Sequence, residues 1–453
     1  MSKIEHVLRI ADGVEMTESL LADYISKHDR MIEAKYKPLL DAYTTNYAIL
    51  DKSINTKSDF KPDNRIAVNF AKYLVDTMNG FFIGIPIKVS SDDESINNEL
   101  QFLDKYNDQD DNNAELSKLC SIFGHAFEMY FNDEEGEIGI TYLSPMDAFM
   151  IYDESILERP RYFIRVYTDT NNVRRGSISD SEYVRYFRFD PSVKWDLDET
   201  GAIYQEEHHF DGVPAVEYLE NAERQGLFEP VMSMIDSYNK AISEKANDVD
   251  YFADAYLKIL GARMEQEDLN QIRRNRIINF DGSSDGNLVV EFLQKPSADG
   301  TQENLLNRLE RLIFQISMIA NINDENFGTS SGIALKYKLQ SMSNLAMTKE
   351  RKFTSGMNQR YKLIFSNPAA HLSSDDWVKI NYKFMRNFPA NLTDEVTNAK
   401  NLSGVVSKET QLSVLSIVDD AQAEIDRMEK EQDPIGYQTD YPTQRVNNDD
   451  GTQ

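Results

Sequence analysis

Three patterns in this sequence contain residue types that could take part in catalysis or binding, and the first contains a candidate nucleophile. Residues 328–332 read Gly-Thr-Ser-Ser-Gly, which matches the Gly-x-Ser-x-Gly pattern of serine hydrolases with Ser330 at the centre. That pattern requires a buried apolar strand directly before it, whereas residues 321–326 read Asn-Ile-Asn-Asp-Glu-Asn. We therefore expect a loop that caps the following helix through Ser330 or Ser331, and no enzymatic activity.

The second pattern places two glutamates before two histidines, at Glu206, Glu207, His208 and His209. Adjacent residues on a strand point to opposite faces of a sheet, so the two imidazoles cannot easily share one metal ion. An exposed strand edge is the better interpretation. The remaining histidines have no metal-binding spacing, Cys120 is expected in the core, and no Gly-x-x-x-x-Gly-Lys-Ser/Thr motif is present. We predict no metal, no cofactor and no P-loop ATP hydrolysis.

The third pattern is a basic segment between residues 333 and 362. Seven basic residues and a single acid, Glu350, give it a charge of +6; the basic residues are Lys336, Lys338, Lys349, Arg351, Lys352, Arg360 and Lys362. Two hypotheses stay open: the segment neutralises acidic neighbours at a packed interface, or it contacts nucleic acid. A smaller cluster of Arg273, Arg274 and Arg276 is balanced by nearby acids, which is typical of a solvated helix face.

Composition narrows the class of protein that must position these residues. The chain has 453 residues and a formal net charge of −28, from 48 lysines and arginines against 76 aspartates and glutamates. Its 23 tyrosines and 23 phenylalanines exclude disorder over the whole length. Glycine and proline are scarce, which favours helices over a turn-rich all-β fold. A single cysteine excludes a disulfide scaffold and fits a reducing cytosol.

Two further classes are disfavoured. The N-terminal residues lack the apolar core of a signal peptide, and the longest apolar runs, 77–87 and 312–323, fall short of the ~20 residues that cross a bilayer. We therefore expect no membrane association. The acidity also argues against a conventional DNA-grasping domain, because such domains are usually strongly basic.

Periodicity predicts a helical first part and a β-rich middle. We expect helices over 17–50, interrupted by Pro38, over 64–78 with a stop at Gly80, and over 115–123. Residues 81–90 alternate as a strand. A hairpin is expected from 126–131 and 138–142, and an antiparallel sheet from further strands at 149–152, 162–167, 183–189 and 202–210.

The second half of the chain is predicted to begin with two long helices. The first, about thirty residues, opens at Glu229-Pro230 and the second near Thr301, with a small α/β unit between them that contains a strand at 288–293. A glycine-bearing loop over 321–332 and a helix over 333–352 follow. The chain then continues with a strand at 378–384, helices at 393–400 and 408–431, and a disordered tail.

This order of parts resembles the portal (connector) proteins of tailed double-stranded-DNA bacteriophages of the siphovirus type. The resemblance covers nearly the whole chain, and no single motif in it is as specific as a catalytic signature. The stretches that carry it are 64–72, 82–87, 142–153, 229–240, 326–339 (Asn-Phe-Gly-Thr-Ser-Ser-Gly-Ile-Ala-Leu-Lys-Tyr-Lys-Leu), 406–415 and 418–425.

The resemblance implies a mainly helical α+β portal fold that assembles as a ring of about twelve subunits. The parts are then a wing at 1–226 and 353–390, stem helices at 227–260 and 301–322, a clip at 261–300, a tunnel loop and following helix at 323–352, and a crown with a flexible tail at 391–453. The implied DNA-channel residues are Asn326, Phe327, Gly328, Thr329, Ser330, Ser331, Gly332, Lys336 and Lys338. The clip residues Arg273, Arg274 and Arg276 are implied to bind partners.

The function implied by the resemblance is a channel at one vertex of the capsid, used to package and eject DNA. Its partners would be other copies of the chain, double-stranded DNA, the terminase motor, a head–tail adaptor, scaffold protein and the major capsid protein. The protein would lie in the virion, and in the host cytoplasm during assembly. The acidity fits passage of DNA, because an acidic lumen repels the duplex and tight phosphate contacts would oppose sliding.

Two alternatives remain beside the portal hypothesis. A non-portal structural adaptor could hold the same long helices in an ordinary bundle, and would show no ring with a hole. A serine hydrolase would be revealed by labelling of Ser330 with a fluorophosphonate.

Overall fold

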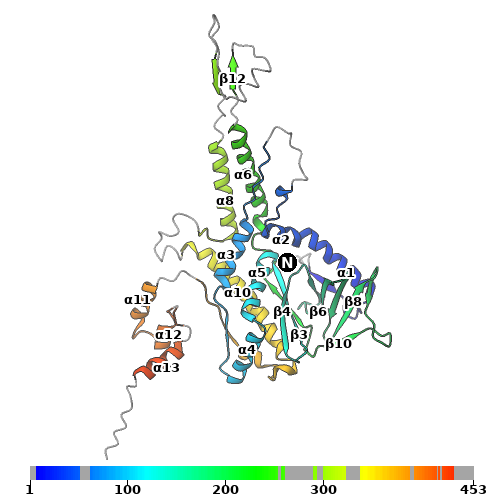
Figure 1. The fold of residues 1–453 in the computed structure, drawn as a ribbon. Helices are drawn as coiled ribbons and strands as arrows, with labels where there is room; N and C mark the ends of the chain where they lie inside the picture. The colour runs from blue at the N-terminus through cyan, green and yellow to red at the C-terminus, as the bar shows by residue number, and fades with distance from the viewer. Residues whose placement is uncertain are drawn as a thin grey trace, which may run out of the picture. The chain divides into compact units, whose positions relative to one another are not determined.

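The computed structural model describes residues 7–51, 62–253, 257–260, 289–292, 299–322, 337–387, 392–415, 417–418 and 421–432. The chain divides into two units, Met1–Asn387 and Phe388–Gln453. Figure 1 shows the helices and strands of the first unit, from which the paired helices α6 and α8 extend.

The larger sheet of the first unit is antiparallel apart from one edge. Its strands follow the order β1-β5-β6-β7-β8-β10, β9 pairs with β8, and β1 is parallel to β5. The strands are β1 (Leu8–Ile10), β5 (Ala148–Asp153), β6 (Pro160–Thr168), β7 (Arg174–Ser179), β8 (Tyr183–Phe189), β9 (Val193–Trp195) and β10 (Gln205–Glu207).

Aspartates close three turns between strands of the first unit by one repeated arrangement. The Asp169 carboxylate accepts hydrogen bonds from the backbone N–H groups two and four residues later, at 2.8 and 2.9 Å, and Asp133 and Asp198 do the same. The tightest position of each turn has a positive φ, at Gly136, Asn172 and Gly201. Short polar side chains that bond their own backbone favour such turns, so the sequence fixes the hairpins locally.

A second sheet packs against the larger one, and its other face packs against helices to form the largest hydrophobic core. It has the order β11-β3-β4, from β11 (Ala215–Leu219), β3 (His125–Asn132) and β4 (Ile138–Leu143). Successive residues of β3 point to opposite faces, so Phe127 packs against the larger sheet while Ala126 and Tyr130 join the helices. The hairpin expected at 126–131 and 138–142 is therefore confirmed.

Helix α1 (Glu18–Met31) packs on the larger sheet through Leu21, Tyr24 and Ile25. The helices that cover the core of the second sheet are η1 (Ile32–Tyr36), α2 (Lys37–Tyr43), α3 (Phe70–Ile83), α4 (Glu94–Tyr106) and α5 (Gln109–Phe123). On α1 the His28 ring is buried, with Nε2 2.7 Å from the carbonyl oxygen of Pro145. Burial lowers the pKa of His28 to about 4. Pro38 does not break the helical run, because a wider π-turn precedes it and places it in the first turn of α2.

The two long helices are α6 (Met232–Ala253) and α8 (Asp299–Ser317), which pack side by side (Figure 1). An extended segment, residues 64–69, runs along α6. Three α6 side chains spaced four residues apart accept hydrogen bonds from alternate backbone N–H groups of that segment: Val68 donates to Asn239, Ile66 to Ser243 and Asn64 to Asn247. Four residues of helix rise about 6 Å and two residues of strand about 6.6 Å, so the two repeats match. We call these three side chains the α6 ladder.

The remaining elements of the first unit are the short helices η2 (Ala48–Leu50), η4 (Glu229–Val231), η5 (Pro368–Ala370) and η6 (Asp376–Lys379), the helix α10 (Gln340–Ile364) and the strands β2 (Lys88–Ser90), β12 (Leu257–Leu260), β13 (Val289–Phe292) and β14 (Asn381–Lys383). β12 pairs with β13 and β14 with β2, both antiparallel. The second unit holds α11 (Leu392–Leu402), α12 (Lys408–Leu412) and α13 (Ala421–Gln432).

Several sequence predictions are wrong in their bounds. The first long helix ends at Ala253, and residues 257–260, which continue its apolar spacing, are strand. The apolar residues 81–83 end helix α3, so Gly80 lies inside it and the strand is only β2. The region 202–210 contains only the three-residue β10, and 378–384 contains η6 and then β14.

Helices also differ from expectation. No helix was expected at α4, and α10 runs to Ile364 where an end near Lys352 was expected. The helix expected over 64–78 begins only at Phe70, because the preceding residues are extended along α6. The helix expected over 408–431 is divided into α12 and α13. None of the helices that the structure describes combines the length and the hydropathy of a membrane span.

Candidate channel and subunit-interface region

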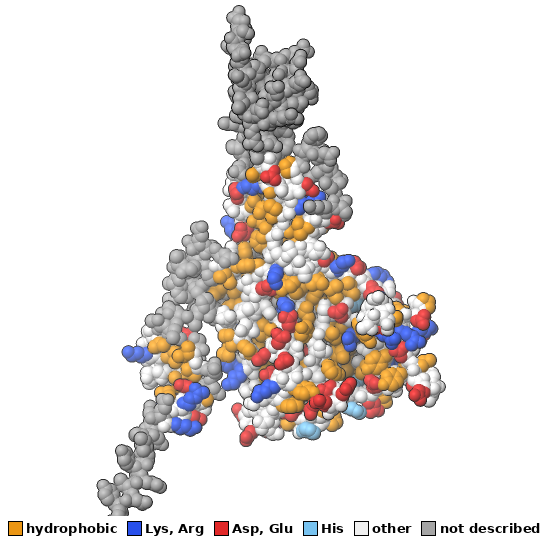
Figure 2. Space-filling model, viewed as in Figure 1, with side chains coloured by type: hydrophobic (Ala, Val, Ile, Leu, Met, Phe, Trp, Pro, Cys, Tyr) orange, Lys and Arg blue, Asp and Glu red, His pale blue; other side chains and the backbone are white. Residues whose placement is uncertain are grey.

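Helix α8 has two apolar faces, and only one of them packs inside the subunit. Leu306 and Ile313 are buried. Leu305 and Ile316 are 50% and 42% exposed, and Leu309 and Leu312 between them are half-buried. These four residues follow steps of four, three and four, which is the spacing of one line along a helix that packs against another helix. We call this line the outer stripe of α8; Figure 2 shows hydrophobic side chains on the visible face of the α6–α8 pair.

A groove of about 730 Å³ lies where the end of α8 meets the start of α10. Its apolar floor includes Phe314 and Ile319, and its charged lining includes Glu310, Arg311 and Lys338. Lys338 is exposed, in the short helical turn that precedes α10. The groove thus brings one residue predicted for the channel beside the last turn of α8.

The other eight residues implied for the channel lie in the part of the chain that the structure does not describe. Asn326, Phe327, Gly328, Thr329, Ser330, Ser331, Gly332 and Lys336 lie outside the described residues, as do the clip residues Arg273, Arg274 and Arg276. The tunnel loop, the clip residues and the Gly-x-Ser-x-Gly pattern therefore stay predictions.

Part of the basic segment is buried within the same subunit. Lys349 of α10 is 1% exposed, and its Nζ lies 2.7 Å from the Glu220 carboxylate. It also donates to the Ser117 carbonyl oxygen at 2.9 Å and to the Ser121 hydroxyl at 2.6 Å. A lysine with three such partners in the core holds α10 against α5 and the end of β11.

Arg360 makes the second buried attachment of α10. Its Nε lies 2.7 Å from Oε2 of Glu128 and its Nη2 lies 2.8 Å from Oε1, so the pair is bidentate, and Nη2 also donates to Asn113 at 2.7 Å. The two charged side chains are 0% and 1% exposed. Burial alone would lower the pKa of Arg360, but Glu128 outweighs it, and the pKa is raised well above its usual value.

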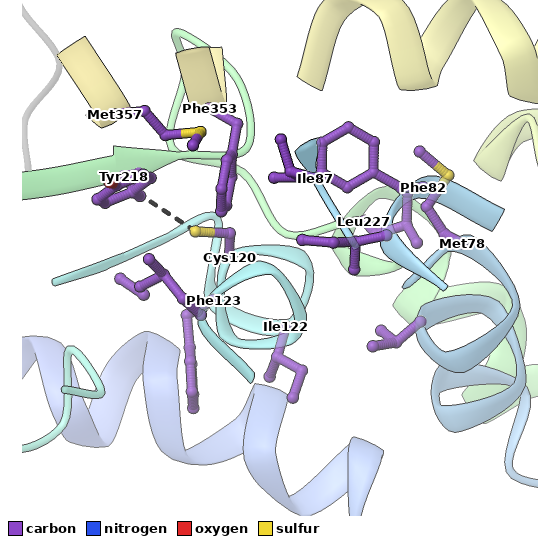
Figure 3. Close-up of a cluster of buried hydrophobic side chains, with 14 of the residues drawn as sticks. Met78, Phe82, Ile87, Cys120, Ile122, Phe123, Tyr218, Leu227, Phe353 and Met357 are labelled. Carbon is purple, nitrogen blue, oxygen red and sulfur yellow. Dashed lines mark hydrogen bonds between the residues drawn. The ribbon is translucent and has the colours of Figure 1, made fainter. Parts of the chain in front are cut away.

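Aromatic side chains also pack α10 against the core. Figure 3 shows Phe353 and Met357 facing Tyr218 and Cys120, and the Tyr218 and Phe353 rings are 4.9 Å apart. A Cβ on Gly356 would come within 2.6 Å of the Tyr218 ring, so this helix position requires glycine. Cys120 is buried, as the sequence predicts, and burial raises the pKa of its thiol.

A third buried ion pair holds the connection into α6. Arg224 donates two hydrogen bonds to the Glu217 carboxylate, both 2.7 Å, and His125 lies 2.7 Å from the same carboxylate. Burial alone would raise the pKa of Glu217, but Arg224 and then His125 hold it well below its usual value. Lys35 donates to the Arg224 carbonyl oxygen at 2.7 Å. Strands β3 and β11 and the residue after β11 thus supply all three carboxylates that fix α10 and the start of α6.

These carboxylates were not found from the sequence, although one signal was present. Glu128 is the only charged residue in the strand His125–Asn132, whose neighbours are apolar or aromatic, and a lone charge in such a run indicates a buried partner. Glu217 in β11 has the same character. Their partners lie in segments far along the chain and could not be assigned from spacing.

The two histidines of the second sequence pattern differ in burial. His208 is buried and His209 exposed, and both lie just after β10, so the exposed strand edge expected there is wrong for His208. No group of three or more His, Cys, Asp or Glu side chains is placed to hold a metal among the described residues.

Comparison with known proteins identifies the class. A family model described as "Phage portal protein, SPP1 Gp6-like" matches residues 22–436. The chain belongs to this family of phage portal proteins, which confirms the resemblance seen in the sequence. Members of the family are structural proteins of the virion.

Two curated relatives bear the name portal protein. One, from Clostridium phage phiCD119, is 23% identical over 437 residues, covering 90% of this chain and 94% of the relative. Another, from Bacillus phage SPP1, is 21% identical over 396 residues, covering 82% and 77%. A solved neck of an empty GTA particle aligns with 76% of this chain and 89% of its own, at 11% identity and a TM-score of 0.43.

Proposed function

We propose that about twelve copies of this chain form a closed ring at one capsid vertex, and that DNA enters and leaves the capsid through its centre. The observation that carries the ring is the outer stripe of α8. Four large apolar side chains stand in a line on a helix that already buries another apolar face, so a second surface must cover them. In a ring each copy offers this stripe to its neighbour and receives one in turn.

The acidic net charge of the chain suits a channel through which DNA slides. The net charge of −28 is repeated in every copy, so the assembled protein repels the phosphate backbone as a whole. Local basic residues then set where the duplex comes near the wall. The burial of Lys349 and Arg360 removes two of the seven basic residues from that role, because both are paired inside the subunit.

We further propose that the loop before Lys338 contacts DNA, with Lys336 or Lys338 supplying a positive collar. The glycines of the loop permit many backbone conformations, and its hydroxyls contact phosphates without adding charge. The competing hypothesis is that both lysines pair with carboxylates of a neighbouring copy. Terminase, a head–tail adaptor, scaffold and the major capsid protein are the proposed partners, with Arg273, Arg274 and Arg276 in the region that docks the first two.

The ring is tested by placing a charge on the outer stripe. Leu305→Asp should convert rings of about ten or more copies into monomers by native mass spectrometry, because it buries a carboxylate at each contact. Asn304→Asp, one residue away on the exposed side of α8, is the matched control and should leave the rings intact. Rings of unchanged mass with Leu305→Asp would place the subunit contact elsewhere, and a wild-type monomer under all conditions would refute the proposed ring.

The collar is tested with Lys336→Gln and Lys338→Gln, measuring ring mass and DNA packaging in parallel. The proposal expects intact rings with altered packaging for one of the two variants. If both variants weaken the ring and intact rings package normally, the lysines belong to the subunit contact.

A further inference from the structure

The turn between β5 and β6, residues 154–159, exposes two large aliphatic side chains. Ile156 is 99% exposed and Leu157 is 66% exposed. Turns are usually built from glycine, asparagine, aspartate, serine and proline, and an aliphatic side chain that stays in water adds nothing to the stability of a fold. Single exposed apolar side chains are common, but two neighbours at the tip of one turn form a surface that a second molecule can cover.

The β5–β6 turn is held in one conformation by its own hydrogen bonds. The Asp153 carboxylate accepts from the N–H of Ser155 at 3.1 Å, from the Ser155 hydroxyl at 2.7 Å and from the N–H of Arg159 at 2.9 Å. The N–H of Asp153 donates to the Arg159 carbonyl oxygen at 2.9 Å, which closes the base of the turn. Arg9 of β1 pairs with Glu158 from the side. A turn that is fixed before binding loses little conformational entropy when a partner covers it.

Two arginines lie beside this apolar tip, and no carboxylate of the described chain pairs with them. Arg159 and Arg161 are exposed and form no ion pair among the residues that the structure describes. Other arginines of the same sheet all have an aspartate or glutamate within 4 Å: Arg9, Arg174, Arg175, Arg185 and Arg188. With Glu154 as the one exposed acid of the turn that is likewise unpaired, this corner is locally positive in a chain of net charge −28.

We propose that the β5–β6 turn anchors a second protein, which receives Ile156 and Leu157 in an apolar pocket and sets carboxylates at the rim of that pocket against Arg159 and Arg161. A few apolar and arginine side chains at the centre of a contact usually carry most of its binding energy, and complementary charge selects the partner. Nucleic acid fits less well, because its phosphates would pair with the arginines and leave both aliphatic side chains in water. The inference adds a binding surface to the proposed function and takes its probes from the partners proposed there.

Binding measurements with the full-length protein test the apolar anchor. The probes are the terminase, head–tail adaptor, scaffold and major capsid protein of the same phage, each purified separately. One of the four should bind the wild type and bind Ile156→Asp and Leu157→Asp at least about tenfold more weakly. Both variants should keep the wild-type thermal midpoint, because these side chains lie in water. Leu197→Asp is the matched control and should bind normally, since Leu197 is 60% exposed near the opposite edge of the same sheet.

Arg161→Gln tests the acidic rim with the same probe. It should weaken binding severalfold and make binding less sensitive to salt, because one charge pair across the contact is lost. Binding by Arg161→Gln that matches the wild type in strength and in salt dependence would contradict the acidic rim.

Three results would overturn the anchor itself. The first is that none of the four proteins loses affinity for Ile156→Asp. The second is a changed ring mass for Ile156→Asp in native mass spectrometry, since the turn would then be a contact between copies. The third is binding to vesicles of phosphatidylcholine and phosphatidylglycerol that Ile156→Asp abolishes, which would assign the turn to lipid. A wild-type monomer that still binds one of the proteins through Ile156 would refute the proposed ring and leave the anchor standing.

Discussion

Replacing Arg360 by methionine is the most direct test of how α10 is held. The substitution keeps the length of an apolar stem and removes a guanidinium that makes two hydrogen bonds to Glu128 and one to Asn113. The Glu128 carboxylate would then remain in a site where it is 1% exposed, with the hydroxyls of Tyr130 and Tyr218 and the amide of Gln109 left to donate to it. Removing one partner of such a pair costs about 3–5 kcal/mol.

The size of the effect is measured by urea unfolding of the Leu305→Asp monomer, followed by tryptophan fluorescence, with Arg360→Met added. We expect a lower midpoint at unchanged slope, since the surface exposed on unfolding stays the same. Adding Glu128→Gln should recover stability, because the penalty arises from an unpaired buried charge. Arg351→Met, an exposed site on the same helix, should change stability by less than about 0.5 kcal/mol. A loss below about 1 kcal/mol for Arg360→Met, or no recovery in the double variant, would refute this account of α10.

Four other substitutions probe the fold. Burial lowers the pKa of His28 from 6.5 to about 4 in the folded protein. The stability that comes from its neutral form is therefore complete above pH 6.5, and the free energy of unfolding falls by about 3 kcal/mol as the pH drops toward 4. His28→Gln should flatten this pH dependence when urea unfolding is measured at a series of pH values. Gly356→Ala should lower the free energy of unfolding by about 1–3 kcal/mol, because it forces a methyl group against Tyr218. Gly80→Ala, whose new methyl group meets open space on α3, should raise it by about 0.5–1 kcal/mol. Both changes are measured by thermal unfolding. Ser243→Ala should lower the free energy of unfolding by about 0.5–1.5 kcal/mol in the same assay, because the part-buried backbone N–H of Ile66 loses its acceptor.

Each of these has a result that would contradict it. An unchanged pH profile in His28→Gln would mean that another group governs acid stability. Equal effects of the two glycine substitutions would remove the steric argument, since they differ in the atoms that the new methyl meets. For the ladder, Ser237→Ala is the control, because this exposed α6 serine bonds only its own helix. Similar losses at both serines would show a general helix effect.

The hairpins could be predicted from the sequence because their signals are local. Asp133 and Gly136 define a turn within five residues, and alternating strands flank it. Apolar runs are different. Phe81, Phe82 and Ile83 are all buried, and a continuous buried run looks the same in a strand and in a helix.

Other errors had different causes. Strand β7 was missed because Gly176 and its serines lack the bulky side chains that mark a strand, although Gly176 is needed where the Phe187 ring approaches. The stretch 257–260 continued the apolar spacing of α6, and only its pairing with 289–292 makes it a strand. Sequence spacing could not decide whether the basic segment pairs with acidic neighbours or contacts nucleic acid. Glu128 and Glu220 lie more than a hundred residues before their partners Arg360 and Lys349.

The α6 ladder has a consequence for how freely this protein can evolve. The hydrogen bonds of the ladder to this segment reach only main-chain groups, so the backbone at positions 64, 66 and 68 is held independently of the side chains there, as long as none of the three is proline. Substitutions at these three positions of the extended segment should therefore be tolerated more readily than substitutions of Asn239 and Ser243 on α6, whose side chains make the hydrogen bonds. A phage can therefore alter the outward side chains of this segment, where Ile66 is 36% exposed, without disturbing the alignment of the helix beneath.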